Sequence, residues 1–195
     1  MTVFRRTINA IRVIDPQRLI IVDGLSTDDR ASAKFPVAVI YKLPKVVLAA
    51  RGYTPGKVTH YKIPWITGAD QWPVPEWPAE TTAEGQMSAL EKQGVDEFRA
   101  YYKPWEDAIH DGAKVMVGEM GAYNKTPHKV VLRWMESCLK LYKQMNIGWV
   151  LWNFRGTTAS PFGPLDSGRE DVIYEDFHGH KLDREMMNLL QKYQK

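Results

Sequence analysis

The sequence lacks the features that mark several large classes of protein. It has one cysteine among 195 residues, Cys138, so no disulfide can form within the chain and the redox compartment stays open. Its longest aliphatic runs, such as residues 46–50, are far too short to cross a bilayer, so we expect no membrane segment. The first residues form no continuous apolar stretch, so we expect no signal peptide. The localisation is left undetermined.

Charge clusters and phosphate-binding loops are also missing. Lys and Arg number 26 against 23 Asp and Glu, a net charge of +3, and no run of five basic residues occurs, which argues against a nucleic-acid partner. Neither GxGxxG nor GxxxxGK follows a predicted strand, so we expect no nucleotide and no other cofactor. Apolar residues make up 44% and charged residues 25%, which excludes a disordered chain and suits a single domain over residues 1–195.

Helices and strands are predicted to alternate along the chain. Apolar residues at helical spacing predict helices near 2–14, 95–109, 127–145 and 182–193, and a weaker one at 26–34. Short β-branched runs predict strands at 19–24, 46–50, 114–119 and 148–153. These runs are continuously apolar, so we expect strands buried on both faces of a parallel sheet, either doubly wound or part of a barrel.

Three local features refine this prediction. Pro104 should kink or restart the helix that contains it. Thr126 and Pro127 are typical of a helix start, with Thr126 as the N-cap and Pro127 at the first helical position, and Cys138 lies on the apolar stripe that follows. A loop rich in Pro and Trp extends over about 53–80, and it is long enough that a functional role is favoured.

The chemistry is expected where parallel strands end. Asp23, Arg51, Tyr53, Glu119 and Trp152 all stand at the carboxyl ends of predicted strands, where α/β folds gather functional groups. A nucleophilic or general-base role is physically sensible for Glu119, although it could instead cap a helix or pair with a strand-end arginine. Asp23 is interpreted as a strand-closing turn residue, with a substitute acid as the alternative.

Two ordered motifs resemble a known family. Residues 117–121 (Val-Gly-Glu-Met-Gly) and 148–153 (Gly-Trp-Val-Leu-Trp-Asn) resemble the end of the catalytic barrel of family 5 glycoside hydrolases, the cellulase family, and residues 50–61 resemble its sixth-strand region. The resemblance implies retaining hydrolysis of β-linked glucans, with Glu119 as nucleophile and Tyr53 as its hydrogen-bond donor. It further implies that sugar contacts come from the following side chains: Trp152, Arg51, His60, Tyr61 and Trp65.

The chain also departs from that family. Arg51 stands where the family usually has histidine, and four strands are predicted where a barrel needs eight. No Asn-Glu pair occurs, although the family's acid/base glutamate follows an asparagine. The fold class is therefore predicted to be α/β, a parallel (β/α) half-barrel resembling strands 5–8 of a TIM barrel.

Several functions follow from a half-barrel. The favoured one is a cellulase-like hydrolase assembled as a homodimer, with a β-glucan as its partner; family members are often secreted. The alternatives are a non-catalytic glucan-binding module and an inactive truncated barrel. His178 and His180, near Asp176 and Asp183, are interpreted as a solvated turn, so no metal site is predicted.

Overall fold

A computed structural model describes residues 2–23, 43–78 and 95–194 of the chain. The predicted helix at 26–34 and the last two residues of the predicted loop at 53–80 lie outside these ranges. The helices are α1 (Thr2–Ile14), α3 (Gly56–Thr59), η2 (Ala69–Gln71), α4 (Val95–His110), α5 (His128–Gln144) and α6 (Arg184–Lys192). The strands are β1 (Ile20–Asp23), β2 (Val46–Gly52), β3 (Lys114–Met120), β4 (Gly148–Leu151), β5 (Glu175–Phe177) and β6 (His180–Leu182).

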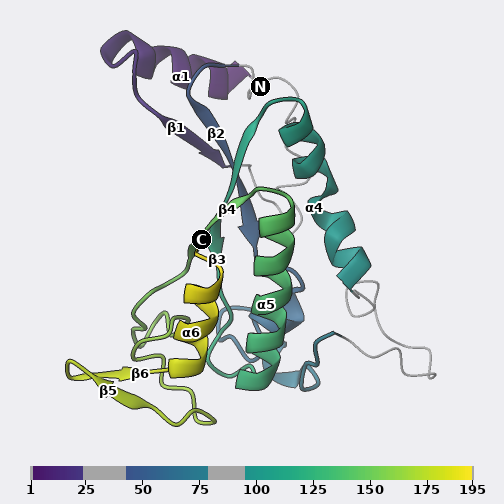
Figure 1. Cartoon of the computed structure of the whole chain (residues 1–195), viewed down its shortest axis with the longest axis vertical. Helices are drawn as coiled ribbons and strands as arrows, with labels where there is room; N and C mark the ends of the chain where they lie inside the picture. Colours follow the sequence, from purple (N-terminus) through teal and green to yellow (C-terminus); the bar gives the residue numbers. More distant parts are fainter. Residues whose placement is uncertain (1, 24–42, 79–94, 195) are drawn as a thin grey trace.

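The centre of the fold is a four-stranded parallel sheet. Its strand order is β1-β2-β3-β4, the order of the sequence, and every neighbouring pair is parallel (Figure 1). The connection from β2 to β3 contains α4, and the connection from β3 to β4 contains α5, as in part of a (β/α)8 barrel. The predicted parallel α/β architecture is confirmed. A small antiparallel hairpin, β5–β6, lies outside the sheet.

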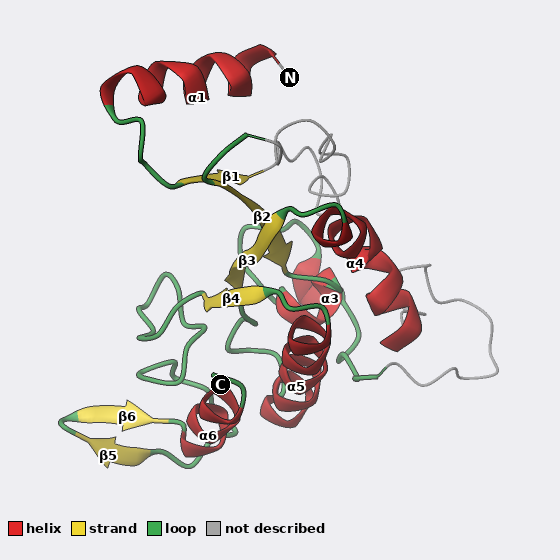
Figure 2. Cartoon of the chain, turned by 45° about the horizontal axis from the view of Figure 1, so that its top comes forward, coloured by secondary structure: helices red, strands yellow, loops and turns green. Residues whose placement is uncertain are grey.

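The helices α4 and α5 cover one face of the sheet (Figure 2). Strand residues that point toward them, including Leu48 and Val117, are fully buried against Trp105 and Trp134. Residues that alternate with them point to the opposite face, where Ile21 is 55% exposed. The expectation that the strands are buried on both faces is therefore wrong for β1 and β4 among the described residues, because α4 and α5 pack on one side of the sheet.

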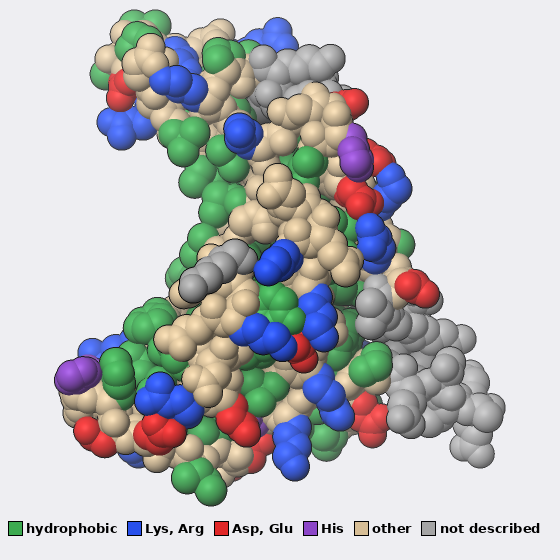
Figure 3. Space-filling view, viewed as in Figure 1, with side chains coloured by type: hydrophobic (Ala, Val, Ile, Leu, Met, Phe, Trp, Pro, Cys, Tyr) green, Lys and Arg blue, Asp and Glu red, His purple; other side chains and the backbone are tan. Residues whose placement is uncertain are grey.

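The opposite face carries apolar side chains at the surface. Ile21 of β1 and Val150 of β4 are exposed, as is Phe154 in the loop after β4. In the space-filling view, hydrophobic side chains follow the hollowed edge of the molecule between α1 and the β5–β6 hairpin (Figure 3). An apolar surface of this kind typically marks an interaction site.

Two predicted helix details differ in the structure. The helix α4 continues through Pro104, so it does not restart there, and the alternative of a kink at Pro104 stays a prediction. The helix α5 begins at His128, with Pro127 as the N-cap residue and no side-chain bond from that cap. The Thr126 hydroxyl instead donates to the carbonyl of Val58, and the carboxylate of Asp171 accepts from the His128 backbone N–H at 2.7 Å. A residue distant in sequence thus satisfies the helix terminus that a local cap was expected to satisfy.

Cys138 is fully buried in the core, as its position on the apolar stripe of α5 predicts. Burial raises the pKa of its thiol well above the usual value, which keeps the thiol protonated and unreactive. Trp77, from the Pro- and Trp-rich loop, is also in the core and donates to the Ser137 hydroxyl at 3.0 Å. That loop is therefore packed against the body of the fold.

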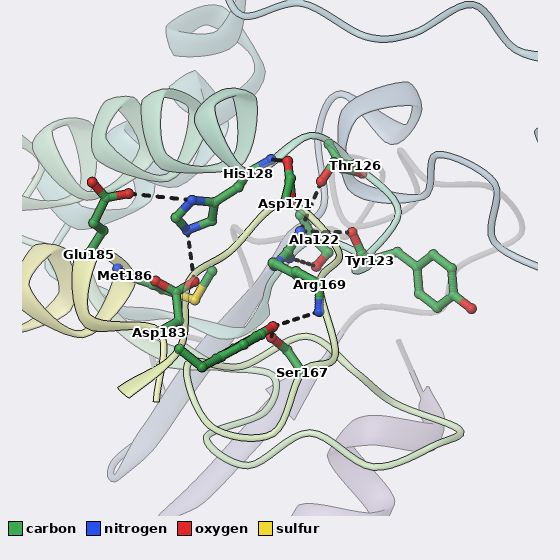
Figure 4. Close-up of polar contacts among 11 residues, drawn as sticks. Ala122, Tyr123, Thr126, His128, Ser167, Arg169, Asp171, Asp183, Glu185 and Met186 are labelled. Carbon is green, nitrogen blue, oxygen red and sulfur yellow. Dashed lines mark hydrogen bonds and ion pairs between the residues drawn. The ribbon is translucent and has the colours of Figure 1, made fainter. Parts of the chain in front are cut away.

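A buried ionic cluster anchors the carboxyl-terminal segment beside the β3–α5 loop (Figure 4). The guanidinium of Arg169 donates to the carbonyls of Ala122 at 2.7 Å and Thr126 at 2.9 Å, and burial lowers the pKa of Arg169. Asp183 caps α6 by accepting from the Met186 N–H, and its other oxygen lies 2.7 Å from His128 Nε2. These contacts fix the loop that directly follows the end of β3.

Candidate functional site

Four polar side chains converge at the carboxyl ends of β1, β2 and β3. Asp23 ends β1, Arg51 and Tyr53 lie at and just beyond the end of β2, and Glu119 is the penultimate residue of β3. All four point to the sheet face opposite α4 and α5, as their contacts with one another require. This is the edge at which parallel α/β folds place their functional groups.

A β-bulge turns Glu119 toward this face. Ala50 pairs with Val117, but the next pair is Arg51 with Glu119, so the register shifts and Gly118 is the extra residue. In a regular strand Glu119 would point the same way as Val117, into the helix-side core, because side chains alternate with a period of two. The bulge places its carboxylate beside Arg51 instead, a common use of bulges near functional sites.

The carboxylate of Glu119 is held by two donors. The Tyr53 hydroxyl donates to Oε1 at 2.6 Å, and the Arg51 guanidinium forms an ion pair with Oε2. The Glu119 side chain remains 26% exposed, so it can still be reached from the open face. The sequence left open whether Glu119 pairs with a strand-end arginine; it does so while keeping one side accessible.

Arg51 also binds a second carboxylate. Its Nη2 lies 2.5 Å from Oδ2 of Asp23. Partial burial alone would lower the pKa of Arg51, but the hydrogen bond that it donates to Asp23 and the charges of Glu119 and Asp23 raise it. The guanidinium is therefore a fixed cation between two anions, and both of its terminal nitrogens are engaged by protein. The sequence left open a substitute acid at Asp23, and in the structure Asp23 is ion-paired with Arg51.

Tyr53 is a neutral hydrogen-bond donor. Burial raises its pKa, and the hydrogen bond to the Glu119 carboxylate raises it further. Its backbone carbonyl accepts from the Thr59 hydroxyl at 2.8 Å, and its ring stands edge-on to that of His60 at 5.2 Å between centroids. Thr59 and His60 are themselves within hydrogen-bond distance, 2.7 Å. The α3 turn thereby fixes the side chain that faces Glu119.

Trp152 follows β4 at the same edge of the sheet. Its side chain is 46% exposed, and its indole N–H donates to the Ser160 hydroxyl at 2.8 Å. Its backbone N–H donates to the Met120 carbonyl, and a Cβ at Gly121 would stand 2.3 Å from the Trp152 carbonyl oxygen. The absence of a side chain at Gly121 thus lets the two strand ends approach closely.

The remaining predicted sugar-binding residues differ in how exposed their side chains are and in what they contact. Trp65 is 59% exposed and stands edge-on to Tyr123 at 6.0 Å between ring centroids. His60 contacts Tyr53, as described above. Tyr61 is only 5% exposed, so the structure does not bring its ring to the surface of the site.

Sequence reasoning missed the pairing of Asp23 with Arg51, and it missed Ser160 and Tyr123 as supports of Trp152 and Trp65. Asp23 and Arg51 both end parallel strands that turn out to be neighbours, so that pairing had a signal once the strand order was known. Ser160 and Tyr123 lie in loops, where no periodicity predicts the direction of a side chain.

The weaker candidates stay apart from this site. His180 lies on the β5–β6 hairpin and its Nδ1 is 2.8 Å from Asp166, whereas His178 lies at the hairpin turn. Within residues 2–23, 43–78 and 95–194, no group of three or more His, Cys, Asp or Glu side chains is arranged to hold a metal ion. Over the same ranges, no helix has the length and apolar character that a membrane span requires.

Comparison with known proteins agrees with this geometry. The family model described as cellulase (glycosyl hydrolase family 5) matches residues 2–157. A crystal structure titled as a glycoside hydrolase is 38% identical with a TM-score of 0.81, and the match covers 100% of this chain and 54% of that one. No curated protein matches the sequence.

More distant structures share the fold. Thermotoga maritima Cel5A, solved in complex with mannotriose, is 18% identical with a TM-score of 0.68, covering 96% of this chain and 52% of that one. The cellulose synthase subunit Z of Clostridioides difficile is also 18% identical with a TM-score of 0.68, covering 95% and 53%. The chain thus spans about half the length of these structures, and its four parallel strands match part of their barrel. On the strength of the family model, the chain belongs to the cellulase family, glycosyl hydrolase family 5.

Proposed function

We propose that the chain supplies the nucleophile of a retaining hydrolase of β-linked glucans, with Glu119 as that nucleophile. The observation that carries the proposal is the arrangement of Glu119. It accepts from Tyr53, pairs with Arg51 and stays partly exposed at the end of a barrel strand. A nucleophilic carboxylate must be oriented and accessible, and these contacts support both conditions.

The reaction would proceed in two displacements. An oxygen of Glu119 attacks the anomeric carbon, the bond to the leaving oxygen breaks, and a glycosyl ester forms on Glu119. A general acid gives the leaving oxygen its proton. Water then attacks the same carbon, gives a proton to the conjugate base of that acid, and releases Glu119 as a carboxylate. Tyr53 would fix one oxygen of Glu119 throughout, and Trp152 would stack against the sugar ring.

The general acid is the group that this chain does not supply by motif, since no asparagine in it is followed by glutamate. We propose that a second copy completes the site. Two copies placed about a two-fold axis would each cover the open sheet face of the other and bring two Glu119 side chains toward one cleft. One carboxyl could then act as acid while the other acts as nucleophile.

An activated substrate tests the nucleophile separately from the acid. Dinitrophenyl β-cellobioside releases a phenolate that needs no proton, so the first displacement, which releases it, depends on the nucleophile and not on the acid. We expect measurable turnover by the unmodified chain and a loss of at least about a thousandfold in Glu119→Gln, which keeps the shape and removes the anion. Proton NMR of the first product should show the β-anomer, as retention requires.

The matched control is Glu170→Gln, the same change at a glutamate that is exposed and ion-paired with Lys125. It should leave turnover unchanged. If Glu119→Gln hydrolyses the substrate as fast as the unmodified chain, the nucleophile lies elsewhere and the proposal is wrong.

A glucan-binding module is the second candidate. It is favoured by the missing Asn-Glu pair together with the exposed indole rings of Trp152 and Trp65, which suit stacking on sugars. Binding of cellotetraose without turnover of the activated substrate, at any protein concentration, would support this candidate over the hydrolase.

A further inference from the structure

The guanidinium of Arg51 is shared between carboxylates from two different strands. One terminal nitrogen pairs with Glu119 of β3, and the other pairs with Asp23 of β1 at 2.5 Å. A guanidinium is planar and its nitrogens are rigidly spaced, so fixing one of them fixes the direction of the other. Asp23 forms its ion pair with Arg51 and not with Glu119, yet it determines how Arg51 meets Glu119.

We propose that Asp23 is a positioning residue that controls Glu119 through Arg51. The inference rests on the proposed role of Glu119 as nucleophile. Asp23 has two effects in this arrangement: it orients the Arg51 side chain, which is 41% exposed and would otherwise sample several rotamers, and it shares the positive charge of the guanidinium.

The charge balance explains why sharing matters. Arg51 and Glu119 alone form a neutral pair. In that pair the whole positive charge of the guanidinium acts on the Glu119 carboxylate and makes it less nucleophilic. With Asp23 included, the three groups carry a net charge of −1. That negative charge is available to the anomeric carbon, which becomes positive in the transition state. Asp23 would thereby make the Glu119 carboxylate more reactive.

Among the described residues, few other groups lie around Glu119. The β2 end brings Arg51 and Tyr53, with His60 behind Tyr53, and β1 brings Asp23. The strand β4 on the other side of β3 has the sequence Gly-Trp-Val-Leu and carries no titratable side chain. The fall in activity at low pH, which is the acid limb of the pH–activity profile, should therefore depend mainly on Asp23 and Arg51.

The test is the pH dependence of kcat/KM for dinitrophenyl β-cellobioside, whose acid limb reports ionisation of the nucleophile in the free protein. In Asp23→Asn, the positive charge of Arg51 is no longer shared with a second carboxylate and favours the ionised form of Glu119 more strongly. The acid limb should therefore move to lower pH by about 0.5–1 unit. Its plateau rate should fall about tenfold or more, because the neutral pair is less reactive. Arg51→Gln should move the acid limb the opposite way, and Asp23→Glu should restore it.

The control is Asp15→Asn, which removes the acid of another Asp–Arg pair at the far end of the sheet, Asp15 with Arg18. It should leave the limb in place. If Asp23→Asn lowers only the thermal unfolding temperature and leaves the limb unmoved, Asp23 is merely structural and the inference is wrong.

Carbon-13 NMR separates this inference from the proposed function. In protein labelled at glutamate carboxyls, the titration of Glu119 should shift to lower pH in Asp23→Asn whether or not any substrate turns over. If the chain shows this shift but hydrolyses no substrate, the coupling between Asp23 and Glu119 is supported and only the proposed function is wrong. A Glu119 titration that is unaffected by Asp23→Asn contradicts the coupling itself.

Discussion

Trp152 is the residue whose contribution to sugar binding can be measured most directly. Its ring is half exposed at the end of β4, and its N–H is already satisfied by Ser160. We expect Trp152→Ala to weaken binding of cellotetraose by about 1–3 kcal/mol, the range for losing an aromatic anchor, as measured by calorimetry. Ser160→Ala keeps the ring and should cost much less. Unchanged affinity with a large drop in thermal stability would instead assign Trp152 to the core.

The polar residues of the site could be named from the sequence, but their connections could not. Glu119, Arg51 and Tyr53 stand at strand ends, and the cellulase resemblance assigned a role to each of them. The pairing of Asp23 with Arg51 depends on which strands are neighbours, and the orientation of Glu119 depends on the bulge at Gly118. A one-residue shift of register leaves no mark in the hydrophobic pattern, because Gly118 carries no side chain to reveal it.

The secondary-structure elements were likewise predictable only in part from the sequence. All four predicted strands of the sheet are present, because continuous β-branched runs are a strong local signal. The local rules failed where a distant contact was decisive. Thr126 was expected to cap α5, but Asp171 satisfies the His128 N–H from the carboxyl-terminal segment, leaving Thr126 free to bond Val58. Such partners are invisible to a window of a few residues.

The β5–β6 hairpin should be held in place by a pH-sensitive contact. Asp166 accepts from the Lys181 N–H at 2.9 Å and from Arg155 and His180 at 2.8 Å each. The backbone bond from Lys181 and the bond from Arg155 lower the pKa of Asp166 to about 2. A carboxyl with a lowered pKa stabilises the fold above its ordinary value of 3.8, and that stabilisation is lost as the pH falls toward 2.

Asp166→Asn should therefore lower the urea midpoint of unfolding at pH 5, and the difference from the unmodified chain should shrink between pH 4 and pH 2. Measuring both midpoints across this interval checks the prediction. A difference that stays constant over the whole range would mean that the ionised carboxylate contributes nothing and that only the side-chain shape matters.

At the scale of the whole molecule, the uncovered face of the sheet determines how we expect the chain to associate. The solved structures that it matches are about twice as long, and the chain's own helices α4 and α5 cover only one side of the sheet. Exposed apolar side chains on the other side, beside the edge strands β1 and β4, are a liability in a solitary molecule. The same face carries Glu119, so whatever covers the sheet also lies beside the proposed nucleophile.

We expect a second copy to cover this face, since closed two-fold dimers are the commonest way to bury such a surface. Light scattering at micromolar concentration should give a mass near twice 22.4 kDa. Ile21→Glu, which puts a charge on the open face, should convert the dimer to a monomer and abolish hydrolysis of unactivated glucan. The same change at Ile173, exposed in the loop before β5, should do neither. In a structure of the dimer, the two Glu119 carboxyl groups should lie about 5–5.5 Å apart for retention, whereas about 6.5–9.5 Å would indicate inversion. A stable monomer at these concentrations would contradict the composite site and leave the nucleophile without its acid.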